Sequence, residues 1–277
     1  MLTLRKLATR ILPSKTKLWL ARKLASYRPV PQLRFKQIQP TELEVKKTRS
    51  LSPLEELGEK YGATKRYHDY LKHYWTHFRE TRESVQNVLE IGVQTDRSVR
   101  MWREFFPNAV IHGLDIDPGC KAYEQDRIQI TIGDQTQPAA LEECLSKMSG
   151  PPDIIIDDGS HRADHQILSM NYLFPRMAAH GIYVVEDTGG CVEDTRLRTV
   201  NRLQKLIGSI FYWPRSPNTH WTTLSEFPES ASWADRNITG IAFYRWIVFV
   251  MRGQNPGDNP HLPLSPERVT ADGLAPN

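Results

Sequence analysis

Acidic residues at the ends of two predicted strands have the clearest chemistry in the chain. Asp158 follows the apolar run Asp153–Ile156, and Glu186 and Asp187 follow Tyr183–Val185. If these strands are neighbours in one sheet, the three carboxylates converge at one rim and repel one another unless a cation joins them. Hard oxygen ligands with open coordination positions favour Mg²⁺. The sequence therefore predicts a divalent-metal site at Asp158, Glu186 and Asp187.

A histidine stands three residues after the first of these carboxylates. Histidine titrates near neutral pH, and a general base needs only hydrogen-bond reach of the proton that it removes. A metal that holds two neighbouring hydroxyls of a substrate would lower the pKa of the one that attacks. We therefore predict that His161 is the catalytic base. Two aspartates after a strand can instead cap a helix, and His165, inside the next predicted helix, is interpreted as an ordinary surface or packing histidine.

A second group of polar residues follows the other predicted strands, where open parallel sheets bind their ligands. A carboxylate and a glycine after the first strand admit the ammonium group of an amino-acid ligand, and the next helix offers free backbone N–H groups. An acid after the second strand suits the two hydroxyls of a ribose, and polar residues after the third suit an adenine edge. The predicted cofactor-binding residues are Glu90, Gly92, Gln94, Ser98, Asp115, Asp134, Gln135 and Asp157.

The order of these contacts distinguishes between cofactors. An acidic first strand, a ribose-binding acid and a polar third strand form the order found in class I methyltransferases, which use S-adenosylmethionine. A nicotinamide-dependent enzyme would carry a Gly-x-Gly-x-x-Gly turn, which is missing here. Each residue alone is also typical of a turn or a helix cap, so the combination carries the prediction.

Alternating strand-like and helix-like segments must hold these residues in place. Short apolar strands separated by helices of about ten residues indicate a parallel sheet covered on both faces. The predicted fold class is α/β, a Rossmann-like doubly wound sheet that is mostly parallel and ends in an antiparallel hairpin. Strands are expected at 87–91, 110–114, 128–131, 153–156, 181–185, 240–244 and 246–251, and helices at 98–106, 139–148 and 165–177.

Charge is distributed unevenly along the 277 residues. Residues 1–50 hold 13 Lys and Arg against 2 Asp and Glu, a charge of +11, so the overall +4 leaves −7 on residues 51–277. A basic amphipathic segment at 1–25 suggests peripheral contact with anionic lipids. The alternatives are a solvated tail or a helix packed on the body or on a second subunit of a homo-oligomer. The acidic body, with no recognisable nucleic-acid module, argues against nucleic acid.

The apolar stretches, the start of the chain and the cysteines indicate where in the cell the protein is expected and how the chain is divided. The apolar stretches are shorter than the roughly 20 residues of a membrane span, the start has no secretory pattern, and three scattered cysteines suggest neither zinc nor disulfides. A cytoplasmic protein is expected, with the inner membrane surface as an alternative. The expected parts are a basic arm and linker at 1–50, a methyltransferase domain at 51–252 with a helical cap at 54–80 and a lid-like insertion at 188–240, and a flexible tail at 253–277.

One long motif reads Asp-Ile-Ile-Ile-Asp-Asp-Gly-Ser-His over Asp153–His161, followed by Leu173–Pro175 and Tyr183–Asp187, and Tyr61–Lys65 reads Tyr-Gly-Ala-Thr-Lys. Over residues 54–251 the chain resembles the metal-dependent sugar O-methyltransferases of macrolide biosynthesis, of the mycinamicin and demethylmacrocin type, and the related cephalosporin-hydroxylase-like proteins. The resemblance implies S-adenosylmethionine and Mg²⁺ as cofactors, with metal and base at the positions given above. It also implies a deoxysugar hydroxyl as acceptor in a sugar-containing substrate, and a pocket closed partly by Tyr61–Lys65.

Two places depart from that family. It usually has a glycine pair where this chain has Asp96 and Arg97, and an aspartate where this chain has Thr64. Side chains at 96 and 97 are expected to crowd the methionine end of the cofactor. A hydroxylase-like relative, a methyltransferase for a non-sugar diol and a noncatalytic binding protein of the same fold are the alternatives. Aromatic residues at 211–233 suit either stacking on a sugar ring or filling the core of the insertion.

Overall fold

The computed structural model describes residues 50–189, 193–210 and 231–255. These residues belong to the larger of two units, Ser50–Asn277. Most of the basic arm, including the proposed membrane contact at 1–25, lies outside the described residues, as do residues 211–230 of the insertion and 256–277 of the tail. Within the described part, no helix is long and apolar enough to cross a membrane.

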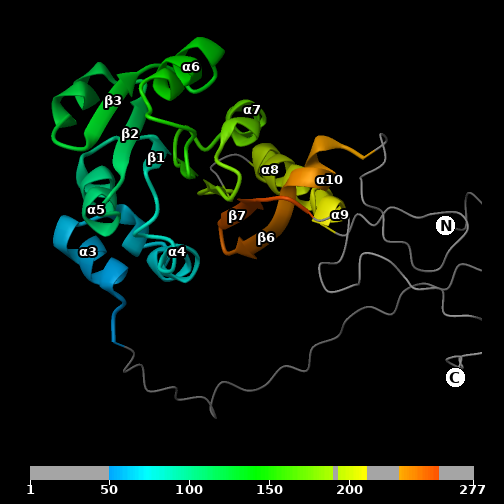
Figure 1. The fold of residues 1–277 in the computed structure, drawn as a ribbon, viewed down its shortest axis with the longest axis horizontal. Coiled ribbons are helices and arrows are strands. Elements are labelled where there is room, and N and C mark those ends of the chain that lie inside the picture. The colour runs from blue at the N-terminus through cyan, green and yellow to red at the C-terminus, as the bar shows by residue number, and fades with distance from the viewer. Residues whose placement is uncertain (1–49, 190–192, 211–230, 256–277) are drawn as a thin grey trace, which may run out of the picture. The chain divides into compact units, whose positions relative to one another are not determined.

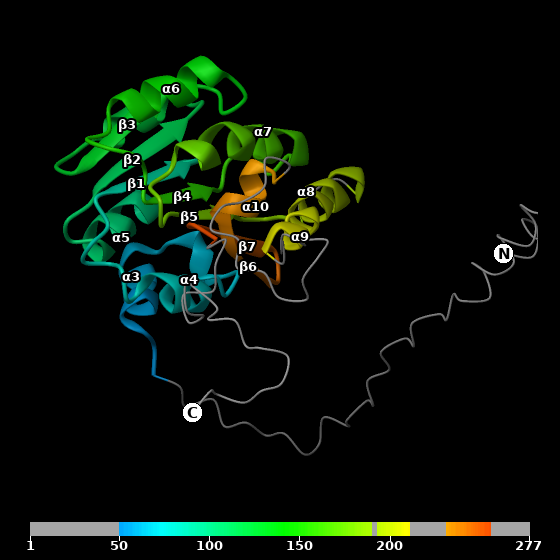
Figure 2. The same ribbon diagram turned by 45° about the vertical axis from the view of Figure 1, so that its right-hand side comes forward.

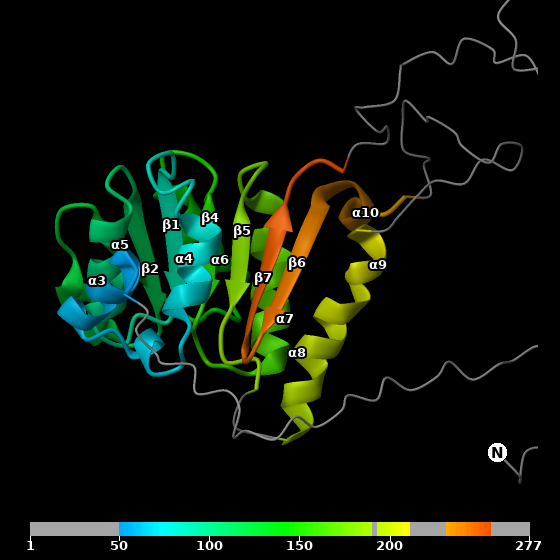
Figure 3. The same ribbon diagram turned by 90° about the horizontal axis from the view of Figure 1, so that it is seen from below.

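A seven-stranded sheet with the order β3-β2-β1-β4-β5-β7-β6 forms the centre of the domain (Figure 1). The strands β1 to β5 run parallel, β7 pairs antiparallel with β5, and β6 pairs antiparallel with β7 at the edge (Figure 3). The predicted doubly wound sheet with a C-terminal hairpin is thus confirmed. The strands are β1 Asn87–Ile91, β2 Val110–Asp115, β3 Ile128–Ile132, β4 Ile154–Asp157, β5 Ile182–Val185, β6 Ile238–Tyr244 and β7 Ile247–Arg252.

The register places the candidate site residues at one level. Ile91 pairs with Asp157, and Asp157 pairs with Val185, so β1, β4 and β5 end side by side. The chain crosses from one side of β1 to the other between β3 and β4, which makes the β1/β4 boundary the point where strand order reverses. Ligands of open parallel sheets bind outside the strand ends at such a point.

Two apolar layers cover the sheet because its strands are buried on both faces. Along β4, Ile154 and Ile156 pack into one core cluster and Ile155 into the other. One layer contains helices α3 and α4 and the helix that follows β1, and the other contains those that follow β3, β4 and β5 (Figure 2).

The longer helices are α3 Pro53–Tyr61, α4 Leu71–Phe78, α5 Arg97–Phe105, α6 Pro138–Ser146, α7 Ala163–Leu173 and α8 Glu193–Lys205. The short ones are η2 Thr64–Arg66, η3 Pro118–Tyr123, η4 Phe174–Arg176, α9 Ile207–Ile210 and α10 Trp233–Asn237.

Local signals start and stop the first helix. Ser52 and Glu55 form a capping box around Pro53 at the helix start, which satisfies backbone donors that the first turn leaves free. Gly62 ends α3 with φ 65°, a left-handed conformation that glycine adopts without steric cost. The chain then turns into η2 and α4, which complete a cap, residues 53–78, on the sheet.

The described part of the insertion differs from the expected lid. Leu203 of α8 is buried in the same cluster as Met170 and Leu173 of α7, and Thr199 Oγ1 donates to Gln166 Oε1 at 3.0 Å. None of the described residues after Asp187 lines the main cavity. Residues 193–210 instead form part of the layer on the α7 side, because the apolar stripe of α8 is buried there.

Three residues of the predicted tail, 253–255, belong to the described part of the chain. The backbone N–H of Gly253 donates to Asn237 O at 3.0 Å, and Asn255 Nδ2 donates to Ile238 O at 2.7 Å. These bonds continue the sheet edge, so the chain stays attached to the domain as far as Asn255.

Candidate active site

A cavity of about 600 Å³ lies beyond the carboxyl ends of the parallel strands. Lys65 and His68 from the cap form one wall, and the loops that follow the strands form the others. The residues predicted from the sequence that line this cavity are Gly92, Gln94, Ser98, Asp115, Asp134, Gln135, Asp158, His161, Glu186 and Asp187. Glu90 and Asp157, which were predicted to touch the cofactor, do not line it.

Gly92 allows two of these loops to touch. It has φ 87°, and a Cβ at this position would collide with the carbonyl oxygen of Asp158 and lie 2.8 Å from Gly159 Cα. The backbone of Asp158 is tied to the same place, since its N–H donates to Ile91 O at 2.9 Å. The loops after β1 and β4 therefore meet through bare backbone at the point where strand order reverses.

Asp115 fixes the loop that follows β1. Its Oδ2 accepts the backbone N–H groups of Val93 and Gln94 at 2.7 and 2.8 Å, and its Oδ1 accepts that of Asp117 at 2.8 Å. Burial opposes the charge on Asp115, but these backbone bonds outweigh it and lower the pKa of the carboxyl. A charged carboxylate thus stands at the end of β2, in the position predicted for ribose recognition.

Glu90 and Asp157 do not line the cavity: Glu90 faces α5 on one side of the sheet and Asp157 faces Gln135 and Tyr183 on the other. Glu90 is fully buried and accepts from Ser98 Oγ at 2.8 Å and Trp102 Nε1 at 3.2 Å. Asp157 accepts from Gln135 Nε2 and Tyr183 OH, both at 3.2 Å. Burial raises the pKa of both acids, that of Asp157 to about 6. In the structure both acids hold residues that line the cavity, and their role as direct cofactor contacts stays a prediction.

The two polar residues after β3 have different roles. Gln135 is buried, and its Oε1 accepts the backbone N–H of Ser160 at 2.8 Å while its Nε2 donates to Asp157 and Ser169. Its amide therefore holds the loop after β4. Asp134 uses one oxygen to accept the N–H of Thr136 at 2.8 Å, a bond that lowers the pKa of its carboxyl, and it lines the cavity as an anion.

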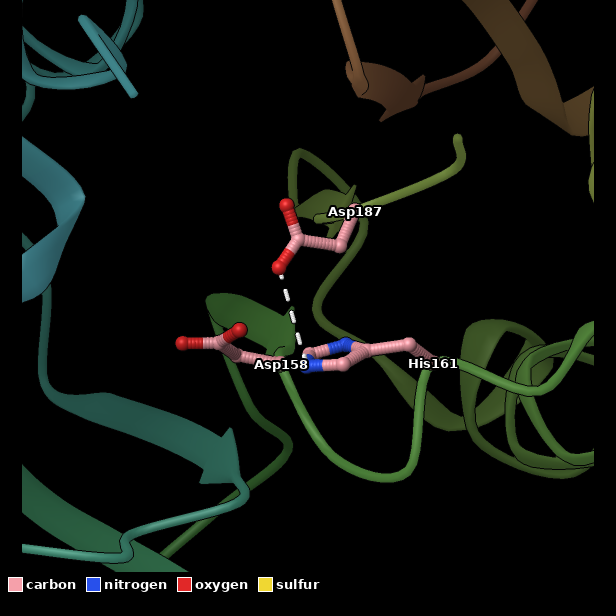
Figure 4. Close-up of side chains that lie close together, drawn as sticks. All are labelled: Asp158, His161 and Asp187. Carbon is pink, nitrogen blue, oxygen red and sulfur yellow. Dashed lines mark ion pairs between the residues drawn. The ribbon is translucent and has the colours of Figure 1, made fainter. Parts of the chain in front are cut away.

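Asp158, His161 and Asp187 form a compact cluster (Figure 4). One ligand atom of each lies within 4.8 Å of the others, which suits a shared cation. His161 Nε2 lies 3.6 Å from Asp187 Oδ2, and Asp187 Oδ1 accepts from Tyr70 OH at 2.6 Å. His161 and Asp187 have φ of 57° and 51°. Non-glycine residues in this region are uncommon and concentrate at functional sites.

Glu186, the third predicted metal ligand, lines the cavity but is more buried than Asp158 and Asp187. Its side chain is buried, and its Oε1 accepts from Lys65 Nζ at 2.8 Å and from Tyr74 OH. Burial, and then the neighbouring Asp158, raise the pKa of Glu186 against the effect of Lys65. Glu186 Oε1 is thus paired with a lysine and a tyrosine, and the second oxygen of Glu186 accepts neither of these two bonds.

Two features of the site were not predicted from the sequence. Lys65 was expected only as part of a segment that closes the pocket, yet it contacts three carboxylates; these partners are far away in sequence and give no local signal. His165, interpreted as an ordinary helix histidine, lines the cavity, and its Nδ1 lies 2.8 Å from Ser160 Oγ. Its place in the first turn of α7, directly after the β4 loop, is the signal that could have indicated this.

Of Asp96 and Arg97, which were expected to crowd the cofactor, only Arg97 lines the cavity. Asp96 pairs with Arg100 at 3.2 Å, one turn along α5, and does not line the cavity. Arg97 does line it, and its Nη1 lies 3.5 Å from the carbonyl oxygen of Gly62. Its guanidinium therefore joins the start of α5 to the end of α3 at the cavity wall.

Curated proteins similar to this chain are sugar O-methyltransferases. Demethylmacrocin O-methyltransferase of Streptomyces fradiae is 34% identical over 227 residues, which are 75% of this chain and 55% of the relative. Mycinamicin VI 2''-O-methyltransferase of Micromonospora griseorubida is 34% identical over 223 residues, 73% of this chain and 53% of the relative. The chain thus spans about half the length of these relatives. No protein-family model matches it.

A solved structure has the same arrangement of elements. The MycE methyltransferase of the mycinamycin biosynthetic pathway, in complex with Mg and SAH, matches with a TM-score of 0.63 at 32% identity. The match covers 77% of this chain and 58% of that protein. The sheet and the cavity at its switch point therefore define the described domain as a Rossmann-like methyltransferase domain. Within that class, it belongs to the family of sugar O-methyltransferases from macrolide and tetracenomycin pathways.

Proposed function

We propose that the protein transfers a methyl group from S-adenosylmethionine to a hydroxyl of a sugar, assisted by a divalent metal. The observation that carries the proposal is the cluster of Asp158, His161 and Asp187 in the cavity at the switch point of the sheet. It is supported by family membership and by the Mg and SAH bound in the MycE structure.

The residues around the donor pocket fit the parts of S-adenosylmethionine. Asp115 presents a charged carboxylate for the ribose hydroxyls, and Asp134 stands where an adenine amino group would need an acceptor. Gly92 and Gln94 bring backbone close to the ligand, with φ 87° and 51°. Arg97 supplies a cation at the same wall.

The metal fits the oxygen atoms of the cluster. Mg²⁺ prefers carboxylate and water ligands, whereas imidazole suits Zn²⁺ and later transition metals. We therefore assign Asp158, Asp187 and the free oxygen of Glu186 to the metal and leave His161 to act as base. A bound Mg²⁺ would lower the pKa of a coordinated acceptor hydroxyl.

His161 would accept the proton of that hydroxyl. Its Nδ1 is buried and has no hydrogen-bond partner within the described residues, while Nε2 faces Asp187. As the proton moves to the imidazole, the acceptor oxygen forms a bond to the methyl carbon and the bond from that carbon to sulfur breaks. The products are a methyl ether, S-adenosylhomocysteine and a protonated His161, and much of the rate would come from orientation.

Calorimetry and turnover test this function together. S-adenosylhomocysteine and Mg²⁺ are titrated separately, and methyl transfer is then measured with mycinamicin VI and with simpler deoxysugar glycosides. We expect binding of both ligands and a methylated sugar that chelation of the metal abolishes. Binding of neither ligand would favour a noncatalytic protein of this fold, and methylation confined to non-sugar diols would refute the acceptor class.

A further inference from the structure

A buried lysine contacts three carboxylates at the proposed active site. Lys65, in the short helix η2, has a side chain that is 1% exposed. Its Nζ donates to Asp158 Oδ2 at 2.6 Å and Glu186 Oε1 at 2.8 Å, and it lies 3.0 Å from Glu90 Oε1. Lysines are almost never fully buried unless they are paired, and the three donors of an ammonium group match three carboxylates.

Two tyrosines of the cap also donate to Glu186 and to its neighbour Asp187. Tyr70 and Tyr74 lie one turn apart at the start of α4, and residues four apart face the same side of a helix. Tyr70 OH donates to Asp187 and Tyr74 OH to Glu186. The backbone of β4 and β5 therefore brings the carboxylates to the rim, and the cap determines where their oxygens lie.

Lys65 and the candidate metal cluster share one residue. Asp158 is paired with Lys65 through Oδ2 and also belongs to the cluster with His161 and Asp187. Glu186 is contacted by Lys65 through Oε1 alone. The ammonium group therefore takes one oxygen from each acid and leaves each with a second. It also offsets the repulsion that would drive three adjacent carboxylates apart.

We infer that Lys65 is a positioning residue for the divalent metal: it orients Asp158 and Glu186 so that their remaining oxygens bind the ion. This inference rests on the proposed function and assigns Lys65 no contact with the reacting atoms. Partners that orient metal ligands through hydrogen bonds commonly change metal affinity by about 10- to 100-fold when they are removed.

Metal binding by Lys65→Met tests the inference without relying on activity. Mn²⁺ is titrated calorimetrically into the protein in the absence of S-adenosylhomocysteine. We expect a Kd about 10- to 100-fold weaker than in the original chain, and turnover that excess metal largely restores. The matched control is Lys60→Met, since Lys60 also lies in the cap but its pair with Glu104 is exposed; its Mn²⁺ affinity should not change.

A Lys65→Met protein that binds Mn²⁺ as tightly as the original chain, or more tightly, would overturn the inference. If circular dichroism shows that this variant is unfolded, Tyr74→Phe provides the test, because it removes only the hydroxyl on Glu186 and keeps the ring packed. We expect its Kd to be about 3- to 10-fold weaker, the equivalent of one hydrogen bond, and an unchanged Kd would again reject the inference. Failure of the original chain to bind Mn²⁺ would instead refute the proposed metal-assisted function.

Discussion

His161 Nε2 and Asp187 Oδ2 lie 3.6 Å apart across two loops that follow neighbouring strands. This distance is within range for an ion pair but beyond that of a good hydrogen bond. Asp187 is itself held by Tyr70, so the imidazole faces a carboxylate whose position is fixed from the other side. The two loops therefore place the proposed base beside a carboxylate that the cap holds in position.

Replacing His161 tests its role as base. We expect His161→Ala to lower kcat by about 10²- to 10⁴-fold, the usual contribution of general acid–base catalysis. Affinity for S-adenosylhomocysteine should stay within a few fold, because the predicted donor contacts come from other loops. Steady-state kinetics and calorimetry measure the two effects. His180→Ala, at an exposed histidine, is the matched control, and a His161→Ala enzyme with undiminished kcat would rule out this base.

Gly92→Ala is expected to destabilise the domain strongly. The new methyl group would collide with the backbone of Asp158 in a left-handed conformation that alanine disfavours. Together these effects should cost about 3 kcal/mol or more, measured by urea unfolding. Gly208→Ala is the control, because it lies in α9 with open space around it. That change should be neutral or stabilising, and equal losses for the two variants would contradict the steric explanation.

Asp115→Asn should weaken cofactor binding. An amide has only one acceptor oxygen, so it cannot satisfy the three backbone N–H groups that the carboxylate now accepts. Loss of one hydrogen bond to a charged group corresponds to about a 10- to 100-fold weaker Kd for S-adenosylhomocysteine. Asp126→Asn, at an exposed position, controls for the change in charge. Unchanged affinity would show that Asp115 neither holds the loop nor contacts the ligand.

Stability at mildly acidic pH should depend on His112. This residue of β2 is buried, its Nε2 has no hydrogen-bond partner within the described residues, and burial lowers its pKa from 6.5 to about 4. Below about pH 6.5 the unfolded chain therefore binds a proton that the folded chain excludes, and stability falls as the pH drops from about 6.5 to 4.

His112→Leu should remove this acid sensitivity. Relative to the original chain, the variant should gain about 3 kcal/mol across that window, as linkage predicts for a shift of about 2.5 pKa units. Urea unfolding at several pH values provides the measurement. Parallel stability curves for the two proteins would show that His112 does not titrate on unfolding.

The succession of strands and helices along the chain could be predicted because short apolar runs alternate with amphipathic helices throughout the domain. The observed strand boundaries differ from the predicted ones where a side chain forms hydrogen bonds to another segment of the chain. Asp153 was placed inside a strand, but its Oδ2 accepts the N–H groups of Gln86 and Asn87 at 2.8 and 2.9 Å, so β4 begins one residue later. Hydrogen bonds of this kind depend on a segment about 66 residues away in the chain, which no local pattern reveals.

The sequence could predict that each acid lies at the end of a strand, but it could not predict whether the side chain of that acid is buried. Glu90, Asp157 and Glu186 looked like ligand contacts because each ends or follows a strand. All three are buried, and each accepts hydrogen bonds from residues on another element. Their burial depends on how the cap, α5 and the loop after β3 pack on the sheet, and the sequence of the strands carries no information about that packing.

Lys65 and Glu186 are 121 positions apart, which has a consequence for biosynthesis. At typical rates of translation, roughly 6–24 s separate the emergence of the lysine from that of the glutamate. During that interval Lys65 lacks one of its three carboxylate partners and Tyr74 lacks the acceptor of its hydroxyl. The docking of η2 and α4 is therefore complete only after β5 has left the ribosome, so a chain cut or stalled before Glu186 would leave the cap less firmly held and more open to chaperones and proteases.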